Sequence, residues 1–566
     1  MSRPGPAPRE RAGARRAASQ TLAGAALLIT AVTIVSRLLG FARQVVQVHQ
    51  VGTEGVGGAY AAANALPNIL YEVAAGGALA GVVVPLLAGP VARRLRLDVD
   101  RSASALLSWA VAVLVPLGVL LLVLAPPIVS GVLGIHDDAT ADVATYFVRV
   151  FAVQVPLYGV GVVLSGVLQA HRRFFWPAAA PILSSLVVVV AYLAFGRLTA
   201  DPADVAGTSD AALAWLAWGT TAGVAAMCLP LLIPVRRAGV RLRPTFSFPA
   251  GQAARARRLA LAGVGAVVGQ QVATLAALWS TQHWGGNGTW TVYQLAQAVY
   301  LLPYAVLAVP LATSAFPRIA ERASSGDHAG FARLVGGTTR AVLAVSVVGA
   351  AALVALAPAV EAVFVRIAKG SVAGMAGTVA WLAPGLVGYA LIFQLSRVLY
   401  TLDEGRAAVR ATVLGWGTAA VASLVLPPLL VRHAADPAAT LEGVAAASSL
   451  GMAVAGLLLL RAVRRSAPAG ALRGTGRTVL VLGCGAVVGA GLGLLVVDAL
   501  LPAHPGWPVA LAVGALGALL AAAVVGAAVL VGDRGTVSGL GGLRRSSARG
   551  ASDEPDDSAA QGGEVR

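Results

Sequence analysis

Charged side chains are scarce in this chain. Of its 566 residues, 12% are charged and 57% are hydrophobic, and the mean hydropathy is +0.79. Water-soluble globular proteins need a charged surface around each core, and their composition lies far from these values. The few charges stand in short clusters between long apolar runs. The composition therefore predicts a protein whose solvent is the lipid bilayer, without a separate soluble domain.

Cysteine, histidine and lysine are also rare. The two cysteines, Cys228 and Cys484, lie far apart in apolar segments, and the seven histidines form no pair at ligand spacing. We therefore expect no metal site. Lys369 is the single lysine, and the net charge of +17 comes from arginines beside apolar runs. Membrane topology requires that placement, so we expect no nucleic-acid partner.

Apolar runs long enough to cross a hydrocarbon core of roughly 30 Å recur along the chain. We expect about fourteen transmembrane helices, at residues 22–43, 57–88, 104–133, 141–169, 175–195, 212–234, 258–282, 289–316, 339–364, 373–399, 408–430, 441–461, 477–500 and 507–531. The fold prediction is an all-α polytopic membrane protein.

A short sequence motif recurs in the two halves of the chain. Leu66-Pro67 recurs as Leu302-Pro303, each followed by an apolar stretch that ends in proline. Repeats offset by an even number of helices keep one orientation, which predicts two parallel six-helix lobes followed by two further helices. The predicted parts are a basic cytoplasmic tail (1–20), an N-lobe (21–235), a basic cytoplasmic linker (236–257), a C-lobe (258–465), two helices (466–531) and a disordered cytoplasmic tail (532–566).

Arginines collect in alternate connections between the predicted helices. They occupy residues 93–96, 172–173, 236–258, 318–333, 406–410 and 461–477, whereas the intervening loops are neutral or acidic. Short loops rich in arginine stay in the cytoplasm. Both termini are therefore predicted to be cytoplasmic, in a bacterial inner membrane.

Ionisable residues inside the predicted spans are few, and they are candidates for function because charge is costly in lipid. Ser36, Gly40 and Arg43 share one helical face, with Arg37 on its flank. Two guanidinium groups can bind a diphosphate bidentately, so we expect Ser36, Arg37 and Arg43 to bind substrate. The alternative, that Arg43 snorkels to the outer interface, stays open. Glu72 is the fourth residue assigned to the substrate site, where it is expected to pair with one of these arginines or to carry H⁺ or Na⁺.

Proline and glycine mark candidate hinges. Pro67 and Pro303 each remove a backbone hydrogen bond and can kink a helix. Gly76 and Gly77 follow Pro67, and Gly40 lies on the polar face of the first span. We predict hinge or gating roles for these five residues.

No loop holds a paired-carboxylate, Ser/His or nucleotide-binding constellation. The sequence therefore predicts a transporter rather than an enzyme, without a cofactor. Transport would be driven by a coupling ion, H⁺ or Na⁺, or by the membrane potential.

At these residues the sequence resembles the MurJ/MviN family, the lipid II flippases of the multidrug/oligosaccharidyl-lipid/polysaccharide exporter superfamily. The resemblance is carried by Ser36-Arg37-Leu38-Leu39-Gly40-Phe41-Ala42-Arg43, Leu66-Pro67-Asn68-Ile69-Leu70, Gly77-Ala78-Leu79, Val84-Pro85, Leu302-Pro303-Tyr304-Ala305-Val306 and Phe316-Pro317-Arg318.

The resemblance implies a V-shaped pair of lobes around a cationic cavity. Alternating access would carry lipid II, the peptidoglycan precursor, to the outer leaflet, with Arg37 and Arg43 holding its pyrophosphate. Two acidic positions of better-known members fall on Gln44 and Gly58 here. Two alternatives stay open: an exporter of another polyprenyl-linked glycan or a drug-like molecule, and a scaffold that recruits cell-wall synthesis proteins.

Overall fold

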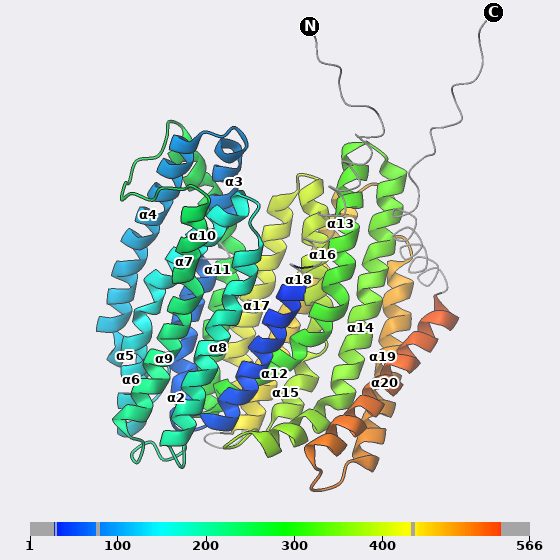
Figure 1. Ribbon diagram of the computed structural model, residues 1–566. Coiled ribbons are helices and arrows are strands. Elements are labelled where there is room, and N and C mark those ends of the chain that lie inside the picture. The colour runs from blue at the N-terminus through cyan, green and yellow to red at the C-terminus, as the bar shows by residue number, and fades with distance from the viewer. Residues whose placement is uncertain (1–27, 29–30, 75–79, 432–435, 534–566) are drawn as a thin grey trace, which may run out of the picture. The chain divides into compact units, whose positions relative to one another are not determined.

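The structure is a computed structural model (Figure 1), which describes residue 28 and residues 31–74, 80–431 and 436–533. These residues are helical almost throughout and contain no strand. The all-α polytopic prediction is confirmed. The predicted N-terminal tail, nearly all of the predicted C-terminal tail, and Gly76 and Gly77 lie outside the described residues.

Eleven helices in the described part of the chain are long and apolar enough to cross a membrane, or twelve if one bent pair counts as a span. The predicted number of fourteen is therefore not confirmed. The predicted span 57–88 contains two shorter helices, α2 (Val56–Glu72) and α3 (Ala80–Ala92). The predicted span 258–282 lies within α11 (Gln252–Gly285), which is long enough but is not among the eleven.

The bent pair occupies the predicted span 373–399. Helices α15 (Met375–Leu382) and α16 (Gly385–Thr401) meet at an angle of 41°. Pro384 lies at the junction. Its ring disfavours a helical conformation for the residue before it, and its nitrogen has no hydrogen to donate. The bend follows from this proline.

The described residues form two compact units. Unit 1 comprises the chain up to Ala298 together with Glu361–Thr378 and Trp416–Ser448. Its helices are Ala31–Gln50, α2, α3, α4 (Arg96–Val123), α5 (Ala125–Gly131), α6 (Asp138–Ala152), α7 (Gln154–Ala170), α8 (Phe175–Leu198), α9 (Asp210–Cys228), the 3₁₀ turn η2 (Leu229–Leu231), α10 (Leu232–Arg237) and α11.

Unit 2 comprises Val299–Val360, Val379–Gly415 and the described chain from Ser449. Its helices are α13 (Val309–Ser324), α16, α19 (Thr475–Leu500) and α20 (Trp507–Gly532). Five more helices have residues in both units, namely α12 (Thr289–Pro303), α14 (His328–Ile367), α15, α17 (Gly405–Leu430) and α18 (Pro437–Ser466). The units describe compactness rather than internal repetition, so the lobe boundaries remain a prediction.

In unit 1, an apolar core lies between α3, α4, α7 and α10. A second group of large side chains places Tyr60 of α2 against α6, where the rings of Phe147 and Phe151 stand nearly perpendicular to the tyrosine ring at 5.8 and 5.7 Å. Edge-to-face contacts of this kind are favourable because of the ring quadrupoles. They fix Tyr60 inside the helical bundle.

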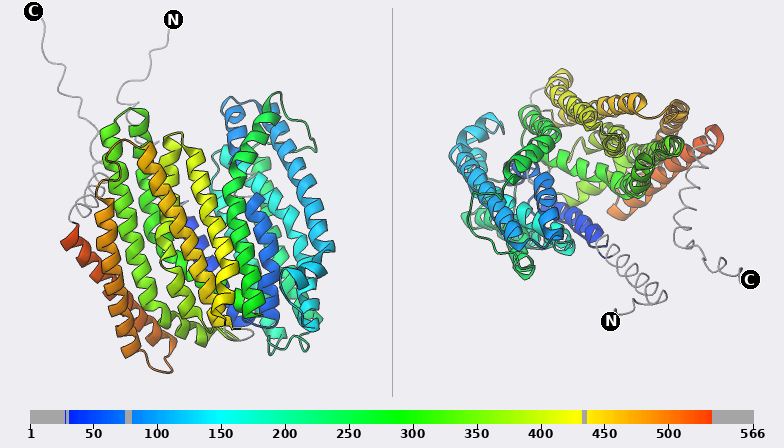
Figure 2. Two further views of the ribbon diagram at one scale, coloured as in Figure 1. Left: turned by 180° about the vertical axis from the view of Figure 1, so that it is seen from behind. Right: turned by 90° about the horizontal axis from the view of Figure 1, so that it is seen from above.

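In unit 2, α19 and α20 lie side by side along their length (Figures 1 and 2). Small residues permit this, because a Cβ at Gly489 would stand 2.8 Å from the carbonyl oxygen of Ala521. Likewise, a Cβ at Gly517 would stand 2.9 Å from the carbonyl oxygen of Gly493. Helices associate in membranes mainly by such close packing.

The arginine-rich connections of unit 1 meet one another. The turn after α7 reaches the end of α10, where Arg173 donates a hydrogen bond to the carbonyl oxygen of Arg237 at 3.4 Å. The neutral connections also meet, because the amide of Val56 donates to the carbonyl oxygen of Pro202 at 3.1 Å. In these two places of unit 1, each connection contacts another of its own kind. Which kind faces the cytoplasm stays a prediction.

Candidate functional site

The helix Ala31–Gln50 carries four of the predicted site residues. Arg37 is exposed, whereas Ser36 and Arg43 are half-buried. No atom lies within 4 Å of the position that a Cβ at Gly40 would take. The two arginines therefore have different surroundings, and Arg43 is the one held among other side chains.

Arg43 lies near a buried polar cluster, which we call the tyrosine network and define as Gln47, Tyr60, Tyr192 and Thr220. The Tyr60 and Tyr192 hydroxyls are 2.9 Å apart, and Thr220 Oγ1 lies 3.0 Å from the Tyr60 hydroxyl. Tyr192 donates to Gln47 Oε1 at 3.2 Å. Both tyrosines are about 1% exposed. The network joins the first helix to α2, α8 and α9.

The guanidinium of Arg43 is close enough to act electrostatically on the hydroxyls of Tyr60, Tyr158 and Tyr192. Gln47 follows Arg43 by one helical turn, so both side chains leave the helix on the same face. The network therefore sets the orientation of the helix that presents Arg43. Sequence reasoning missed these tyrosines. Tyrosines within the predicted apolar spans were the signal that could have revealed the network. A buried tyrosine hydroxyl needs a hydrogen-bond partner, so such a residue indicates a polar contact inside the protein.

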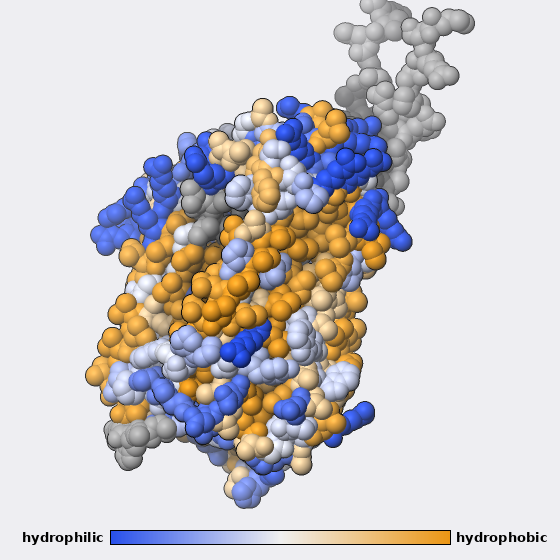
Figure 3. All heavy atoms as spheres, turned by 90° about the vertical axis from the view of Figure 1, so that its left-hand side faces the viewer, coloured by the Kyte–Doolittle hydropathy of each residue, from blue (hydrophilic) through white to orange (hydrophobic). Residues whose placement is uncertain are grey.

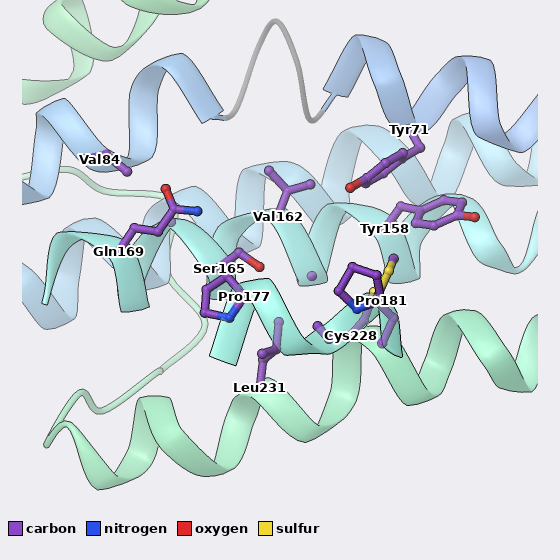
Figure 4. A pocket seen from close by; sticks show the side chains of 14 residues that line it. Tyr71, Val84, Tyr158, Val162, Ser165, Gln169, Pro177, Pro181, Cys228 and Leu231 are labelled. Atoms are coloured by element: carbon purple, nitrogen blue, oxygen red, sulfur yellow. The ribbon is translucent and has the colours of Figure 1, made fainter. Parts of the chain in front are cut away.

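A second polar group lies between α2 and α7. Tyr158 donates to Asn68 Oδ1 at 3.0 Å, and the rings of Tyr71 and Tyr158 are 4.4 Å apart. Both tyrosines line a cavity of about 230 Å³, which Figure 4 shows with Gln169 and Cys228 also on its wall. The Leu-Pro-Asn motif thus supplies a structural hydrogen bond through its asparagine.

Glu72, at the last residue of α2, differs from its prediction. Its side chain is exposed, and it forms no salt bridge with Arg37 or Arg43, all three being described residues. The expected ion pair is therefore absent from this conformation. Glu72 follows Tyr71, which lines the 230 Å³ cavity, in the last turn of α2. Its role as a carrier of H⁺ or Na⁺ remains a prediction.

The two predicted hinge prolines differ in their surroundings. Pro67 is buried within α2, and the helix continues past it to Glu72. Pro303 ends α12, and a π-helical turn, Tyr304–Ala308, follows at once. Such turns are uncommon and often occur at functional positions in helices. Gly40, Pro67 and Pro303 stay predicted hinges, and the π-helical turn after Pro303 is consistent with that role.

The far end of the first helix is held by loops. The Lys369 amide donates to the carbonyl oxygen of Val48 at 2.9 Å, and the Thr53 amide donates to the carbonyl oxygen of Lys369 at 2.9 Å. Thr53 Oγ1 also donates to the carbonyl oxygen of Ser371 at 2.9 Å. This exchange ties the loop after the first helix to the loop after α14. The helix is thus anchored at its C-terminal end.

Gly58 lies where the structure leaves no room for a side chain. A Cβ at residue 58 would stand 1.7 Å from Asn287 Oδ1 and 2.7 Å from the Gly288 amide nitrogen. Asn287 in turn donates to the carbonyl oxygen of Gly55 at 3.3 Å. The loop before α12 fills the space that a side chain at residue 58 would need.

We expect Gly58→Ala to destabilise the protein by about 1–3 kcal/mol, the usual cost of overpacking, because a backbone atom of Gly288 has to move. The measurement is thermal unfolding of the purified protein in detergent. Gly89→Ala is the matched control, since no atom lies within 4 Å of a Cβ there. Equal melting of the two variants would contradict the account of Gly58.

A comparison with protein families matches residues 48–501 to the family described as "Lipid II flippase MurJ". The chain belongs to this family. The MurJ family comprises transporters, so the chain is a multi-pass membrane transporter and not an enzyme.

Two curated MurJ proteins illustrate the relationship. The "Probable lipid II flippase MurJ" of Rhizobium tropici is 25% identical over 420 residues, which cover 71% of this chain and 75% of that protein. The "Lipid II flippase MurJ" of Burkholderia cenocepacia is 26% identical over 405 residues, covering 69% and 75%.

Solved structures show the same fold. The structure "Lipid II flippase MurJ, inward closed conformation" aligns with a TM-score of 0.68 at 16% identity, and the alignment covers 88% of this chain and 98% of that one. An inward-facing multidrug resistance MATE family transporter of the MOP superfamily aligns with a TM-score of 0.60 at 14% identity, covering 78% and 98%. At these identities the likeness concerns the MurJ-type fold alone.

The MurJ family match begins at residue 48, after Arg37 and Arg43. The roles of these arginines therefore rest on the residues themselves and their surroundings. The final predicted span, 507–531, also lies beyond the match, and α20 occupies it.

Proposed function

We propose that the protein is a lipid II flippase, which moves this lipid-linked peptidoglycan precursor from the cytoplasmic to the outer leaflet of the bacterial inner membrane. The observation that carries the proposal is membership of the MurJ family over residues 48–501. Alternating access is the mechanism proposed, with both termini in the cytoplasm.

The chemistry of the first helix supports an anionic substrate. Lipid II carries a diphosphate, and guanidinium groups bind phosphates with directed hydrogen bonds. Arg43 is half-buried beside the tyrosine network, so its position is restricted, whereas Arg37 is exposed one to two turns earlier in the same helix. We assign diphosphate binding to both arginines, with Ser36 as a neutral donor. Glu72 and a coupling ion, H⁺ or Na⁺, remain the candidates for energy coupling, beside the membrane potential.

Complementation tests the proposal directly. A bacterial strain depleted of its own lipid II flippase is expected to regain growth and cell shape when this chain is expressed in its membrane. A scaffold without transport would not rescue growth, so failure by a well-expressed, correctly inserted protein would overturn the proposal.

Substrate binding separates the remaining alternatives. Purified protein is expected to bind lipid II more tightly than undecaprenyl phosphate, because only lipid II has the diphosphate and the glycan. Equal affinity for the two lipids would instead favour an exporter of another polyprenyl-linked molecule.

A further inference from the structure

An extended segment runs along α4 in unit 1. The amides of Arg241, Arg243 and Thr245 donate hydrogen bonds to Asp100 Oδ1, Ser104 Oγ and Ser108 Oγ at 3.0, 2.9 and 3.1 Å. Four helical residues rise about 6 Å, and two extended residues span about 6.6 Å. The two spacings match, so alternate amides of the segment meet successive turns of the helix.

These three hydrogen bonds fix the directions in which the side chains of the segment point. Val240 is buried in the core of unit 1, and Leu242 packs against the same core. Arg241 and Arg243 alternate with these residues and are exposed. Pro244, which has no amide hydrogen, falls between two amides that donate, where none is needed. The sequence of the segment is therefore consistent with a fixed, extended conformation that presents two arginines together.

Beside this segment lies a groove of about 1290 Å³. Its charged lining consists of Arg96, Arg236, Arg241, Arg243 and one carboxylate, Asp100. One oxygen of that carboxylate already accepts the Arg241 amide. Four arginines and one aspartate give the lining of the groove a net charge of +3.

The other half of the groove is apolar. It is lined by Leu107, Val111, Ala112 and Phe246. Phe246 stands edge-on to Trp109 at 5.4 Å between ring centres, and the indole donates to the Phe246 carbonyl oxygen at 3.2 Å. Both rings are about half exposed.

Exposed aromatic side chains gather at the level where a membrane meets water. Beyond Trp109, α4 exposes Val113 and Val119 at 58% and 54%. Figure 3 shows this face of the molecule, with hydrophilic residues along the upper rim and a largely apolar band below them. The groove therefore extends from a cationic end at the interface to an apolar end at the depth of acyl chains.

We infer that this groove binds an anionic phospholipid. Arg241 and Arg243 hold the headgroup phosphate, with Arg96 and Arg236 contributing charge, and an acyl chain lies against Leu107, Val111 and Phe246. Basic sites at the cytoplasmic ends of membrane helices recognise such headgroups through their positive charge. A free phosphate would use only the cationic end. The inference does not depend on the proposed flippase activity.

Lipid-dependent stabilisation of the full-length protein tests the site. The protein is purified in detergent and titrated with phosphatidylglycerol or phosphatidylcholine, and the apparent melting temperature is followed. We expect phosphatidylglycerol, but not phosphatidylcholine, to raise the apparent melting temperature. In the double variant Arg241→Gln/Arg243→Gln, the apparent affinity is expected to fall roughly 10-fold or more, since two arginines are lost.

Arg406→Gln/Arg410→Gln is the matched control. It removes the same charge from two exposed arginines in another arginine-rich connection, and it is expected to keep the full response. If both double variants lose the phosphatidylglycerol response equally, the response is a general effect of charge and the proposed site is overturned.

Ala112→Trp provides a variant that keeps every arginine. It fills the apolar end of the groove and is expected to weaken the phosphatidylglycerol response. A normal response in this variant, or an equal response to inorganic phosphate in the wild-type protein, would overturn the assignment of a lipid.

Discussion

Arg43→Ala is expected to lower lipid II translocation roughly 10- to 100-fold while the protein still inserts normally. Hydrogen bonds to a charged group contribute about 1.5–3 kcal/mol each, and about 1.4 kcal/mol corresponds to a tenfold change. Alanine removes a charge that the first helix holds beside the tyrosine network. The measurement is translocation by protein reconstituted in vesicles, normalised to the amount inserted.

Arg37→Ala is expected to lose activity in the same assay. Arg93→Ala serves as the control, because Arg93 is exposed in the connection between α3 and α4 and has no proposed role. Wild-type translocation by both Arg37→Ala and Arg43→Ala would remove the assigned site while leaving membership of the family intact. Loss in Arg43→Ala accompanied by a lower melting temperature would instead point to a role in folding.

Gly388→Leu is expected to destabilise unit 2 by about 3 kcal/mol, at the upper end of overpacking effects. A Cβ at Gly388 of α16 would stand 2.1 Å from the carbonyl oxygen of Met452 in α18, and a Cβ at Gly456 would stand 3.2 Å from the Gly388 Cα. The two helices cross at this pair of glycines. Because backbone atoms fill the space, a side chain can enter only if the helices separate.

The measurement is thermal unfolding together with the yield of monodisperse protein. Gly417→Leu is the control, because Gly417 of α17 is exposed and has open space at its Cβ position. If Gly388→Leu and Gly417→Leu unfold at the same temperature, the two helices do not cross closely at Gly388.

The fold class was accessible from the sequence because the bilayer imposes a simple rule. An apolar run of sufficient length becomes a helix, since the bilayer core offers no water to its backbone groups. That rule located the helices but not the bend at Pro384, which depends on how one proline is accommodated between α15 and α16.

The candidate site was accessible only in part. Ser36, Arg37 and Arg43 stand out because polar residues are rare in an apolar helix, which is a property of the sequence. The expected pairing of Glu72 with Arg37 or Arg43 is not seen among the described residues and stays a prediction, since pairing requires two side chains from different helices to meet. Helical periodicity determines which residues share a face of one helix, but it does not determine the distance between side chains on two different helices.

The sequence by itself determined the membrane environment, the approximate position of most helices, the grouping of arginines in alternate connections and the resemblance to a family of lipid flippases. Only the tertiary structure decided that Tyr60 and Tyr192 share a hydrogen-bonded network, that Asn287 fills the space beside Gly58, and that Arg241 and Arg243 lie along α4. The reason is physical. Burial in lipid acts on each residue locally, whereas hydrogen bonds and close packing join residues that are distant in the chain.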